Sequence, residues 1–446
     1  MTSKGRDAMS RRRAGVHNVT IELAAETALI DEAIEVTIRG DLPGDRVRLH
    51  SSIQDDNGVT WKSVAVFESS DDGVISTSTS VSAGGTYTGL DPAGIYWSML
   101  PAEQDGDPSS FAAGSLRPAT MTIMAECIGR ELAEVSLERR FIDPDVTVQE
   151  IREDGLVGTL FLPPGGGPAP AVITLGGSGG GMGGARETAA LLASRGFVAM
   201  SLAYFAMDGL PDHLIEIPLE YFERALTWLR GHGAVAGGRV AISGVSRGGE
   251  LVLLLGSTFP DLVDAIIAWV PSSVMWAGIG QGNSAIGSPS WSYRDEPLPF
   301  MRDRVTPEQD AEIIGHEPVA LARRYLINLE DRSAIGDAAI PVERIRCPLL
   351  LISGDDDAMW PSSLMSDMVV ERLAEHNHQH PYRHLQYAGA GHGIRAPHLP
   401  TTVNTGRHPI RGFLVARGGD PAAHARAQAE VWPEALRFLE ASLSER

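Results

Sequence analysis

The sequence predicts two domains, an all-β sandwich followed by a larger α/β domain built on a mostly parallel sheet of about eight strands. Three observations lead to this expectation. Residues 16–143 contain short segments in which polar and apolar residues alternate, the pattern of half-buried antiparallel strands. In residues 144–446, apolar strand segments alternate with helical segments, the order of right-handed β-α-β units. The pattern changes at Asp143-Pro144, so we place the domain boundary there.

The composition is that of a folded protein without a nucleic-acid partner. The chain has 446 residues, 43% of them hydrophobic, and a formal net charge of −20 at pH 7. Binding to phosphate backbones needs a concentrated basic face, but basic residues cluster only in residues 1–15, which we expect to be a disordered tail. No apolar run reaches the roughly 20 residues that span a bilayer, and no signal peptide is evident. We therefore expect a cytoplasmic protein with no membrane partner, with a transit peptide as the alternative for the Arg-rich start.

In the first domain, the alternating segments are expected to pair into an immunoglobulin-like antiparallel sandwich. Asn57-Gly58 and Asp72-Gly73 have the composition of hairpin turns. We expect this domain to be structural or to support a lid. The clearest strand segments are 19–23, 34–38, 47–49, 63–67 and 120–124.

The second domain opens with a predicted hairpin through Asp154-Gly155, and the alternation of strands and helices follows. Residues 271–346 interrupt it, and their scattered aromatic residues suit either a pocket lining or the packing of a long loop. The predicted strands are 146–151, 156–162, 171–175, 197–202, 239–244, 265–270, 349–353 and 382–387. The predicted helices are 188–194, 219–230, 249–257, 363–375 and 422–443, the last interrupted at Pro433.

A catalytic serine is predicted where the strand at 239–244 meets the next helix. Gly244, Ser246 and Gly248 form G-x-S-x-G, in which glycines flank a strained serine on a sharp strand-to-helix turn. The helix that follows would direct its N-terminal N–H groups toward a negative charge developing at the serine. The structural alternative is a tightly packed turn without chemistry.

A serine hydroxyl needs a base and an acid that orients the base, and both follow in the expected places. Asp355, Asp356 and Asp357 come after the strand at 349–353, and His392 lies between two glycines after the strand at 382–387. The order Ser, Asp, His at strand ends is that of the α/β-hydrolase fold. We choose Asp357 as the acid, with Asp356 as the alternative. The cluster His376, His378 and His380 is expected to be a solvated loop, so no metal site is predicted.

The glycine-rich segment 176–181 follows the strand at 171–175, so its backbone N–H groups are candidates for an oxyanion hole. We expect the N–H groups near Ser178 and of Arg247 to hold the oxyanion. A glycine-rich loop after a strand can instead indicate dinucleotide binding, but the required G-x-G-x-x-G opening a helix, with an acidic residue about 20 positions later, is not well matched. Cys127 and Cys347 are far apart in sequence and are expected to be buried thiols.

Together with these residues, further segments resemble the acyl-CoA thioesterase and bile acid-CoA:amino acid N-acyltransferase family over nearly the whole chain. The resemblance implies a β-sandwich domain, an α/β-hydrolase domain, and cleavage of an acyl-CoA thioester without a cofactor. The matching segments are 85–87, 94–98, 158–164, 176–180, 203–205, 219–222, 246–250 and Asp356-Asp357 with Trp360.

Within that family resemblance, a serine at position 246 favours hydrolysis, because the acyl-transferring branch usually has cysteine there. The predicted function is a serine thioesterase in which Ser246 attacks the thioester, His392 acts as base and Asp357 orients His392. The alternatives are an acyl-CoA-dependent N-acyltransferase that uses the same residues and a non-catalytic binding protein. The predicted partner is an acyl-CoA or a related small acyl thioester.

Overall fold

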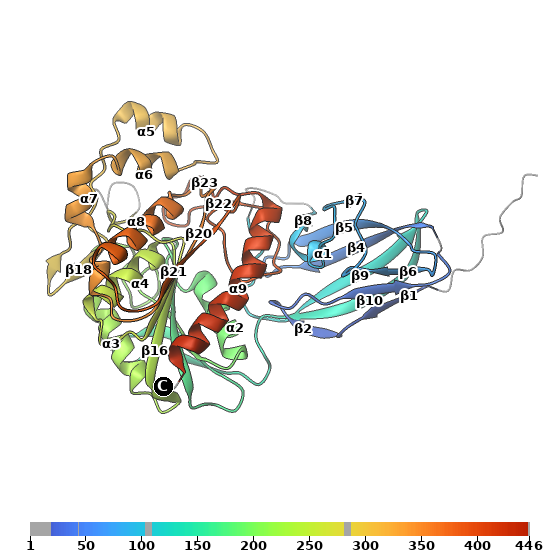
Figure 1. The fold of residues 1–446 in the computed structure, drawn as a ribbon, viewed down its shortest axis with the longest axis horizontal. Helices are drawn as coiled ribbons and strands as arrows, with labels where there is room; N and C mark the ends of the chain where they lie inside the picture. The colour runs from blue at the N-terminus through green and yellow to red at the C-terminus, as the bar shows by residue number, and fades with distance from the viewer. Residues whose placement is uncertain (1–18, 43, 103–108, 281–286, 445–446) are drawn as a thin grey trace, which may run out of the picture.

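The computed structural model describes residues 19–42, 44–102, 109–280 and 287–444, which form a β-sandwich and an α/β domain (Figure 1). Residues 1–15, predicted as a disordered tail, lie outside the described residues. The cytoplasmic location inferred from that end of the chain stays a prediction. Among the described residues, no helix is both long and apolar enough to cross a bilayer.

The sandwich has one large and one small sheet, whose strands expose every second residue. The burial of β4 and β5 alternates along each strand, and Gly58 closes the hairpin between them with φ 81°, as predicted. The large sheet has the order β2 (Thr27–Leu29), β10 (Arg130–Arg140), β9 (Ala119–Cys127), β4 (Arg46–Gln54), β5 (Thr60–Glu68) and β7 (Gly84–Gly85), with β8 (Leu100–Pro101) also paired to β5. The small sheet has the order β1 (Thr20–Leu23), β3 (Val36–Arg39) and β6 (Val74–Ser76).

Two expectations for the sandwich were wrong in detail. Asp72-Gly73 does not close a hairpin, because β6 pairs with β3 of the small sheet and not with the preceding β5. Gly73 passes so close to Gly40 that a Cβ atom would lie 2.0 Å from its carbonyl oxygen, so this turn carries the chain from one sheet to the other. The pairing is also not wholly antiparallel, since β2 lies parallel to β10.

The α/β domain contains the predicted eight-stranded sheet. Only the pairs β11–β12 and β12–β14 are antiparallel, and the Asp154-Gly155 hairpin is present as predicted. The sheet is covered on both faces, which explains why its strands are continuous apolar runs. Its order is β11 (Thr147–Ile151), β12 (Val157–Leu162), β14 (Val198–Ala203), β13 (Ala169–Leu175), β16 (Val235–Val245), β17 (Ala265–Trp269), β20 (Leu349–Gly354) and β21 (Tyr382–Tyr387).

Helices cover the two faces of this sheet. One face packs against α2 (Gly183–Ser194) and α9 (Pro421–Leu443), and the other against α3 (Leu219–Arg230), α4 (Arg247–Thr258) and α8 (Ser362–Glu375). The predicted interruption at Pro433 was wrong, because α9 is continuous through it. Its neighbours Trp432 and Ala435 are buried, and this packing outweighs the lost backbone hydrogen bond.

Residues 271–346 are more regular than their sequence suggested. They contain β18 (Trp291–Tyr293), β19 (Glu296–Pro297), α5 (Pro307–Ile314), α6 (Ala322–Asn328), α7 (Arg332–Ala338) and the 3-10 helix Val342–Arg344, and β18 pairs with β15 (Ile217–Pro218). Figure 1 shows α5, α6 and α7 stacked at one end of the α/β domain. A sequence signal for α5 was available, since Thr306 and Gln309 form a capping box with proline at the first helical position.

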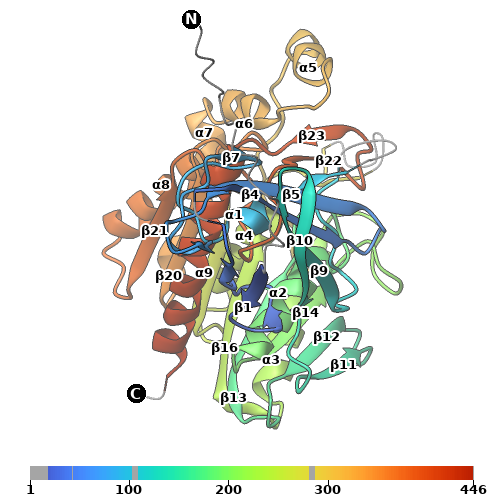
Figure 2. The ribbon, with the colours of Figure 1, turned by 90° about the vertical axis from the view of Figure 1, so that its right-hand side faces the viewer.

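The sandwich packs directly on α2 and α9. These helices lie on the side of the α/β domain that faces the sandwich in Figure 1, and Figure 2 views the protein from the sandwich side. Asp31, whose side chain is 2% exposed, accepts hydrogen bonds from Arg195 at 2.6 Å and from the indole of Trp432 at 2.8 Å. The backbone N–H of Thr401 also donates to the carbonyl of Trp97 at 3.0 Å. One hydrophobic core therefore runs from the sandwich strands into the α/β domain.

Candidate active site

Ser246 lies on a sharp turn between β16 and α4. Its backbone has φ 61° and ψ −118°, a strained combination for a residue with a side chain. The turn needs its flanking glycines, because a Cβ atom on Gly244 would lie 2.1 Å from the carbonyl oxygen of Gly248. Gly248 in turn passes against the Gly176 backbone, where a Cβ atom would lie 2.5 Å from oxygen. The local sequence therefore forces the serine to the start of α4.

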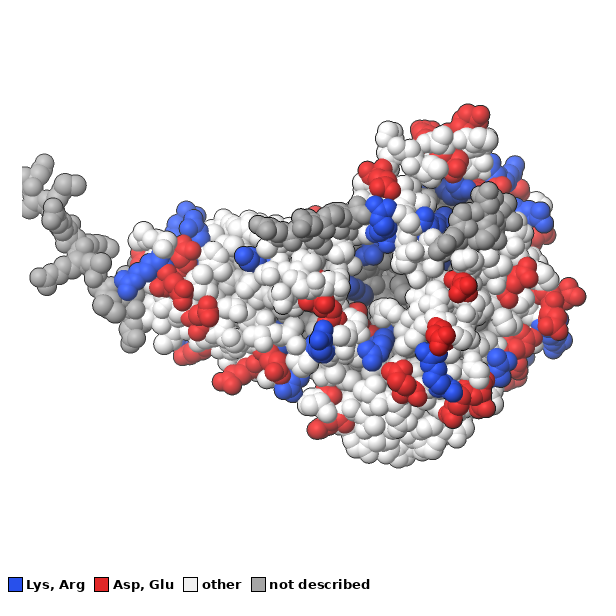
Figure 3. Space-filling model, turned by 180° about the vertical axis from the view of Figure 1, so that it is seen from behind, with Lys and Arg blue, Asp and Glu red and all other residues white. Residues whose placement is uncertain are grey.

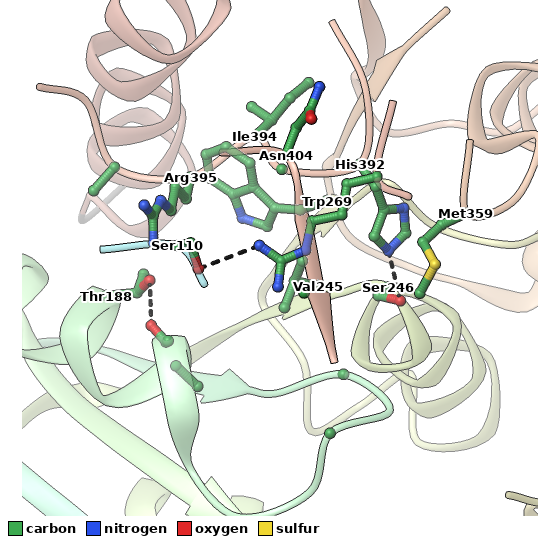
Figure 4. A pocket seen from close by; sticks show the side chains of 18 of the residues that line it. Ser110, Thr188, Val245, Ser246, Trp269, Met359, His392, Ile394, Arg395 and Asn404 are labelled. Carbon is green, nitrogen blue, oxygen red and sulfur yellow. Dashed lines mark hydrogen bonds between the residues drawn. The ribbon is translucent and has the colours of Figure 1, made fainter. Parts of the chain in front are cut away.

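The structure brings the three predicted catalytic side chains together in one chain of hydrogen bonds. His392 Nε2 lies 2.9 Å from Ser246 Oγ, and His392 Nδ1 lies 2.8 Å from Asp357 Oδ2 (Figure 4 draws the first of these contacts). A carboxylate only accepts, so Nδ1 carries the proton and Nε2 is left to accept from the serine hydroxyl. The three residues follow β16, β20 and β21, at the carboxyl ends of parallel strands.

Asp357 is held as an acceptor by its surroundings. Its Oδ1 accepts from the backbone N–H groups of Met359 at 2.9 Å and Trp360 at 3.2 Å, and its Oδ2 accepts from the hydroxyl of Ser362 at 2.7 Å. Its side chain is 2% exposed. These donors stabilise an ionised carboxylate directed at His392.

The two neighbouring aspartates make different contacts. Asp356 accepts from the backbone N–H of Gly419 at 3.1 Å, and Asp355 accepts from that of Gly389 at 2.7 Å. Both carboxylates therefore join neighbouring loops and do not contact the imidazole. This geometry favours Asp357 over Asp356 as the orienting acid.

A second histidine, which the sequence analysis missed, fixes the loop of His392. His424 Nε2 accepts from the backbone N–H groups of Gly391 at 3.1 Å and Gly393 at 3.2 Å. Burial lowers the pKa of His424, which keeps it neutral and able to accept. On α9 it occupies a buried position, so by sequence it resembles any core histidine.

Ser178 and Arg247, the predicted oxyanion residues, both lie beside Ser246 and line a small cavity with it. Arg247 is the first residue of α4, where N–H groups have no partner within the helix. Gly177 packs on the nucleophile, since a Cβ atom there would lie 3.1 Å from the Cβ atom of Ser246. The backbone of segment 176–178 thus runs close enough to the serine to supply donors.

The side chain of Ser178 has a separate partner in His408. His408 Nδ1 accepts from the backbone N–H groups of Ile410 at 3.3 Å and Arg411 at 3.2 Å, so its Nε2 carries the proton and donates to Ser178 Oγ at 3.1 Å. Burial lowers the pKa of His408 to about 4, so it stays neutral at physiological pH. This contact fixes the glycine-rich loop next to the nucleophile.

The side chain of Arg247 forms a buried ion pair that sequence reasoning also missed. Its Nη1 lies 2.7 Å from Glu250 Oε2, and neither side chain is more than 2% exposed. The other carboxylate oxygen accepts from the indole N–H of Trp291 at 2.7 Å, while the guanidinium donates to the carbonyl of Trp276 at 3.1 Å. Both tryptophans are buried in hydrophobic clusters, so here the scattered aromatics pack the loop.

Glu250→Gln should destabilise the fold by about 2–4 kcal/mol, because an amide would direct a donor at Arg247 or Trp291. Burial raises the pKa of Glu250 to about 7, with Arg247 opposing the shift. The contribution of Glu250 to stability is fully present below the pKa that this group has in the unfolded chain. It is lost as the pH rises through about 7, the pKa in the folded protein. The difference in the free energy of unfolding between wild type and Glu250→Gln, measured by urea denaturation, should therefore be smaller at pH 7.5 than at pH 5.

The matched control for that measurement is Glu22→Gln, which breaks an exposed ion pair with Arg39. Exposed pairs contribute less than about 1 kcal/mol, so this variant should match wild type at both pH values. If the difference in the free energy of unfolding between wild type and Glu250→Gln instead grew as the pH rose, the raised pKa of Glu250 would be contradicted.

A cavity of about 360 Å³ opens beside Ser246. Its apolar wall includes Val245, Trp269 and Ile394, and Ser110 of the sandwich domain also lines it (Figure 4). The space-filling view in Figure 3 shows a hollow at the junction of the two domains, with Lys and Arg side chains near it. Both domains therefore build the space next to the nucleophile.

His376, His378 and His380 lie at and beyond the end of α8, where His376 caps the helix. The rings of His378 and His380 are 5.5 Å apart. Among residues that the structure describes, no group of three or more His, Cys, Asp or Glu side chains is arranged to hold a metal ion.

The sheet order, the elbow at Ser246 and the Ser-His-Asp hydrogen bonds define an α/β hydrolase with a serine-hydrolase type of site. Comparison with known proteins gives the family. Residues 31–153 match "Acyl-CoA thioester hydrolase/BAAT N-terminal region", and residues 217–445 match "BAAT / Acyl-CoA thioester hydrolase C terminal". The chain belongs to this acyl-CoA thioester hydrolase/BAAT family.

Two relatives found by sequence match along almost their full length. Acyl-coenzyme A thioesterase 1 of Mus musculus is 31% identical over 93% of this chain and 94% of its own. Acyl-coenzyme A thioesterase 2, mitochondrial, of Mus musculus is 30% identical over 96% of this chain and 90% of its own. Among solved structures, the Pyrococcus horikoshii acylaminoacyl peptidase has a TM-score of 0.41 and 17% identity, covering 96% of this chain and 62% of its own.

Proposed function

We propose that this protein is an acyl-CoA thioesterase that forms an acyl ester on Ser246 and hydrolyses it with water. The observation that carries the proposal is the unbroken hydrogen-bond chain from Ser246 through His392 to Asp357. Family membership supports an acyl-CoA as the substrate, since full-length relatives are named acyl-coenzyme A thioesterases.

In the acylation half, Ser246 Oγ bonds to the thioester carbonyl carbon while its proton passes to His392 Nε2. Asp357 holds Nδ1–H and stabilises the imidazolium. The carbonyl oxygen becomes an oxyanion, for which we propose the backbone N–H groups of Ser178 and Arg247 as donors. Collapse breaks the C–S bond, and His392 returns the proton to the departing thiolate of CoA.

In the deacylation half, water takes the place of the thiol. His392 Nε2 accepts a proton from water as its oxygen bonds to the acyl carbon of the ester. Collapse of the second tetrahedral intermediate breaks the C–O bond to Ser246, which recovers the proton from His392. The products are a free acid and CoA, and every step uses only water and residues already described.

The test is a panel of acyl-CoA substrates of increasing chain length, assayed by release of free thiol and by product mass. We expect equal amounts of CoA and free acid. Labelling by a fluorophosphonate at Ser246 distinguishes an enzyme from a non-catalytic binding protein, because only an activated serine reacts. Absence of both thiol release and labelling would overturn the proposal in favour of the binding protein.

Ser246→Cys separates hydrolysis from acyl transfer. Amines attack thioesters much more readily than oxygen esters, so an acyl-cysteine should pass more of its acyl group to an amine. With one acyl-CoA and excess glycine, wild type should give mostly free acid, and the variant a larger fraction of N-acylglycine at lower turnover. Mass spectrometry of the products decides this. Mostly N-acylglycine from wild type would favour an N-acyltransferase instead.

A further inference from the structure

The cavity beside Ser246 differs in charge from the rest of the protein. The chain has 57 Asp and Glu residues and a net charge of −20. Yet among the described residues that line this cavity there is no Asp or Glu, whereas Arg395 and Arg417 line it together with Arg407. The described lining of this cavity is therefore cationic, in a protein that is acidic overall.

Two of these arginines, Arg395 and Arg417, are half-buried and have few protein partners. Within the described part of the chain, Arg395 makes no hydrogen bond or ion pair, and the only side-chain hydrogen bond of Arg417 is to Ser110 Oγ at 3.3 Å. The two fully buried guanidinium groups of the described residues, those of Arg139 and Arg247, have protein acceptors, although the Nε atom of each has none. Arg139 donates to the carbonyls of Glu32 at 2.7 Å and Ile30 at 2.8 Å, and Arg247 is paired with Glu250.

Arg395 and Arg417 lie close enough for the positive charge of Arg395 to lower the pKa of Arg417. Burial, together with the nearby charge of Arg395, lowers the pKa of Arg417 to about 10. Burial also lowers the pKa of Arg395. Glu187 is the carboxylate that acts on Arg395, but it forms no ion pair with it, and burial raises the pKa of Glu187. A bound anion would relieve both the burial cost and the mutual repulsion.

Both arginines belong to segments that position the catalytic histidine. Arg395 follows His392 by three residues, and the backbone carbonyl of Arg417 accepts from the N–H of His392 at 2.8 Å. In Figure 4, Arg395 lies toward one end of the cavity and the Ser246–His392 pair toward the other, with Val245 and Trp269 between them. Both arginines thus line the same space as the nucleophile, and Arg395 lies across an apolar stretch from it.

The size of the cavity suggests which part of the substrate enters it. At about 360 Å³, the cavity lies at the lower end of the range of about 300–1,000 Å³ for small-molecule pockets. A short acyl chain fits this volume.

We propose that Arg395 and Arg417 form a subsite for an anionic oxygen group of the substrate, and that this group is a carboxylate at the far end of a short acyl chain. The other anionic groups of an acyl-CoA are the phosphates of CoA. The inference rests on the proposed thioesterase function and specifies its substrate class as acyl-CoAs of dicarboxylic acids. The apolar residues between nucleophile and cations would contact the methylene groups of the chain.

The test compares adipyl-CoA with hexanoyl-CoA, which have equally long chains ending in a carboxylate and a methyl group. Wild type should have the higher kcat/KM for adipyl-CoA. In Arg395→Gln and Arg417→Gln, the adipyl-to-hexanoyl ratio of kcat/KM should fall about tenfold to hundredfold, the effect of removing one charged hydrogen bond. Arg346→Gln, which alters an exposed arginine paired with Asp261, should keep the wild-type ratio.

A second arm separates the two sources of the anion. The same two acyl groups are presented as N-acetylcysteamine thioesters, which carry no phosphate. If the subsite binds the acyl carboxylate, the adipyl-to-hexanoyl ratio of kcat/KM should fall in Arg395→Gln and Arg417→Gln with these thioesters too. If the arginines instead bind CoA phosphates, the two variants should keep the wild-type adipyl-to-hexanoyl ratio with N-acetylcysteamine thioesters. Their preference for CoA thioesters over N-acetylcysteamine thioesters should fall, and this result would overturn the proposal.

Adipate itself gives a readout independent of turnover and of variant folding. Isothermal titration calorimetry of the wild-type protein should show adipate binding more tightly than hexanoate. Equal or absent binding of adipate, in a protein that still releases thiol from acyl-CoAs, would overturn the subsite and leave the thioesterase assignment intact. No thiol release from any of the four thioesters, by a protein that cleaves longer acyl-CoAs, would also overturn the subsite, whereas no release from any acyl-CoA would refute the proposed function.

Discussion

Ser246→Ala is expected to lower kcat by about 10⁴- to 10⁶-fold while leaving the protein folded. The methyl group removes the atom that bonds to the substrate, so acylation has no route through an acyl ester. Alanine also suits this strained turn no worse than serine does, because the positive φ is imposed by the flanking glycines. Thiol release by the purified variant measures the effect, and circular dichroism checks the fold.

The matched control is Ser178→Ala, which changes a neighbouring serine but keeps its backbone N–H group. If that N–H holds the oxyanion, activity should stay within about tenfold of wild type, because only the contact with His408 is lost. A loss as large as that of Ser246→Ala would show that the hydroxyl, not the backbone, does the chemistry. Near-normal thiol release by Ser246→Ala would disprove the nucleophile assignment.

Asp357→Asn is expected to lower kcat by about 10⁴-fold. The amide oxygen would remain with the backbone N–H groups of Met359 and Trp360, which donate to Oδ1. The amide nitrogen would then face His392 Nδ1 and favour the tautomer with its proton on Nε2. That tautomer cannot accept the proton of Ser246.

Asp356→Asn is the comparison, since Asp356 accepts a single hydrogen bond from Gly419 and does not contact the imidazole. It should cost no more than about tenfold in kcat. Steady-state kinetics of the two variants at one pH ranks the two aspartates. A larger loss for Asp356→Asn would reverse the assignment of the orienting acid.

The parts of the fold that sequence predicted are those dictated by local pattern. Buried parallel strands are continuous apolar runs, and the glycines around Ser246 permit only a tight turn, so the eight-stranded sheet and the elbow could be anticipated. The parallel order of the strands then brings Asp357, His392 and Ser246 to the same end of the sheet, where the carboxyl ends of the strands meet. These features depend on neighbours in sequence and on one general rule of topology.

What escaped prediction depends on contacts between distant segments. Pro433 continues a helix because packing at Trp432 outweighs a local preference, and Gly73 crosses between sheets because β6 finds its partner in β3. The roles of His424 and Glu250 likewise exist only once loops from elsewhere lie against them. No periodicity in the sequence reports such pairings.

The core shared by the sandwich and the α/β domain has a consequence for how the protein unfolds. Trp432 of α9 is buried against the sandwich and donates to Asp31, and Ser110 of the sandwich completes the substrate cavity. Separating the domains would expose an apolar face and open the cavity wall at once. The two domains should therefore lose structure in a single cooperative transition, and an isolated catalytic domain would be neither stable nor complete.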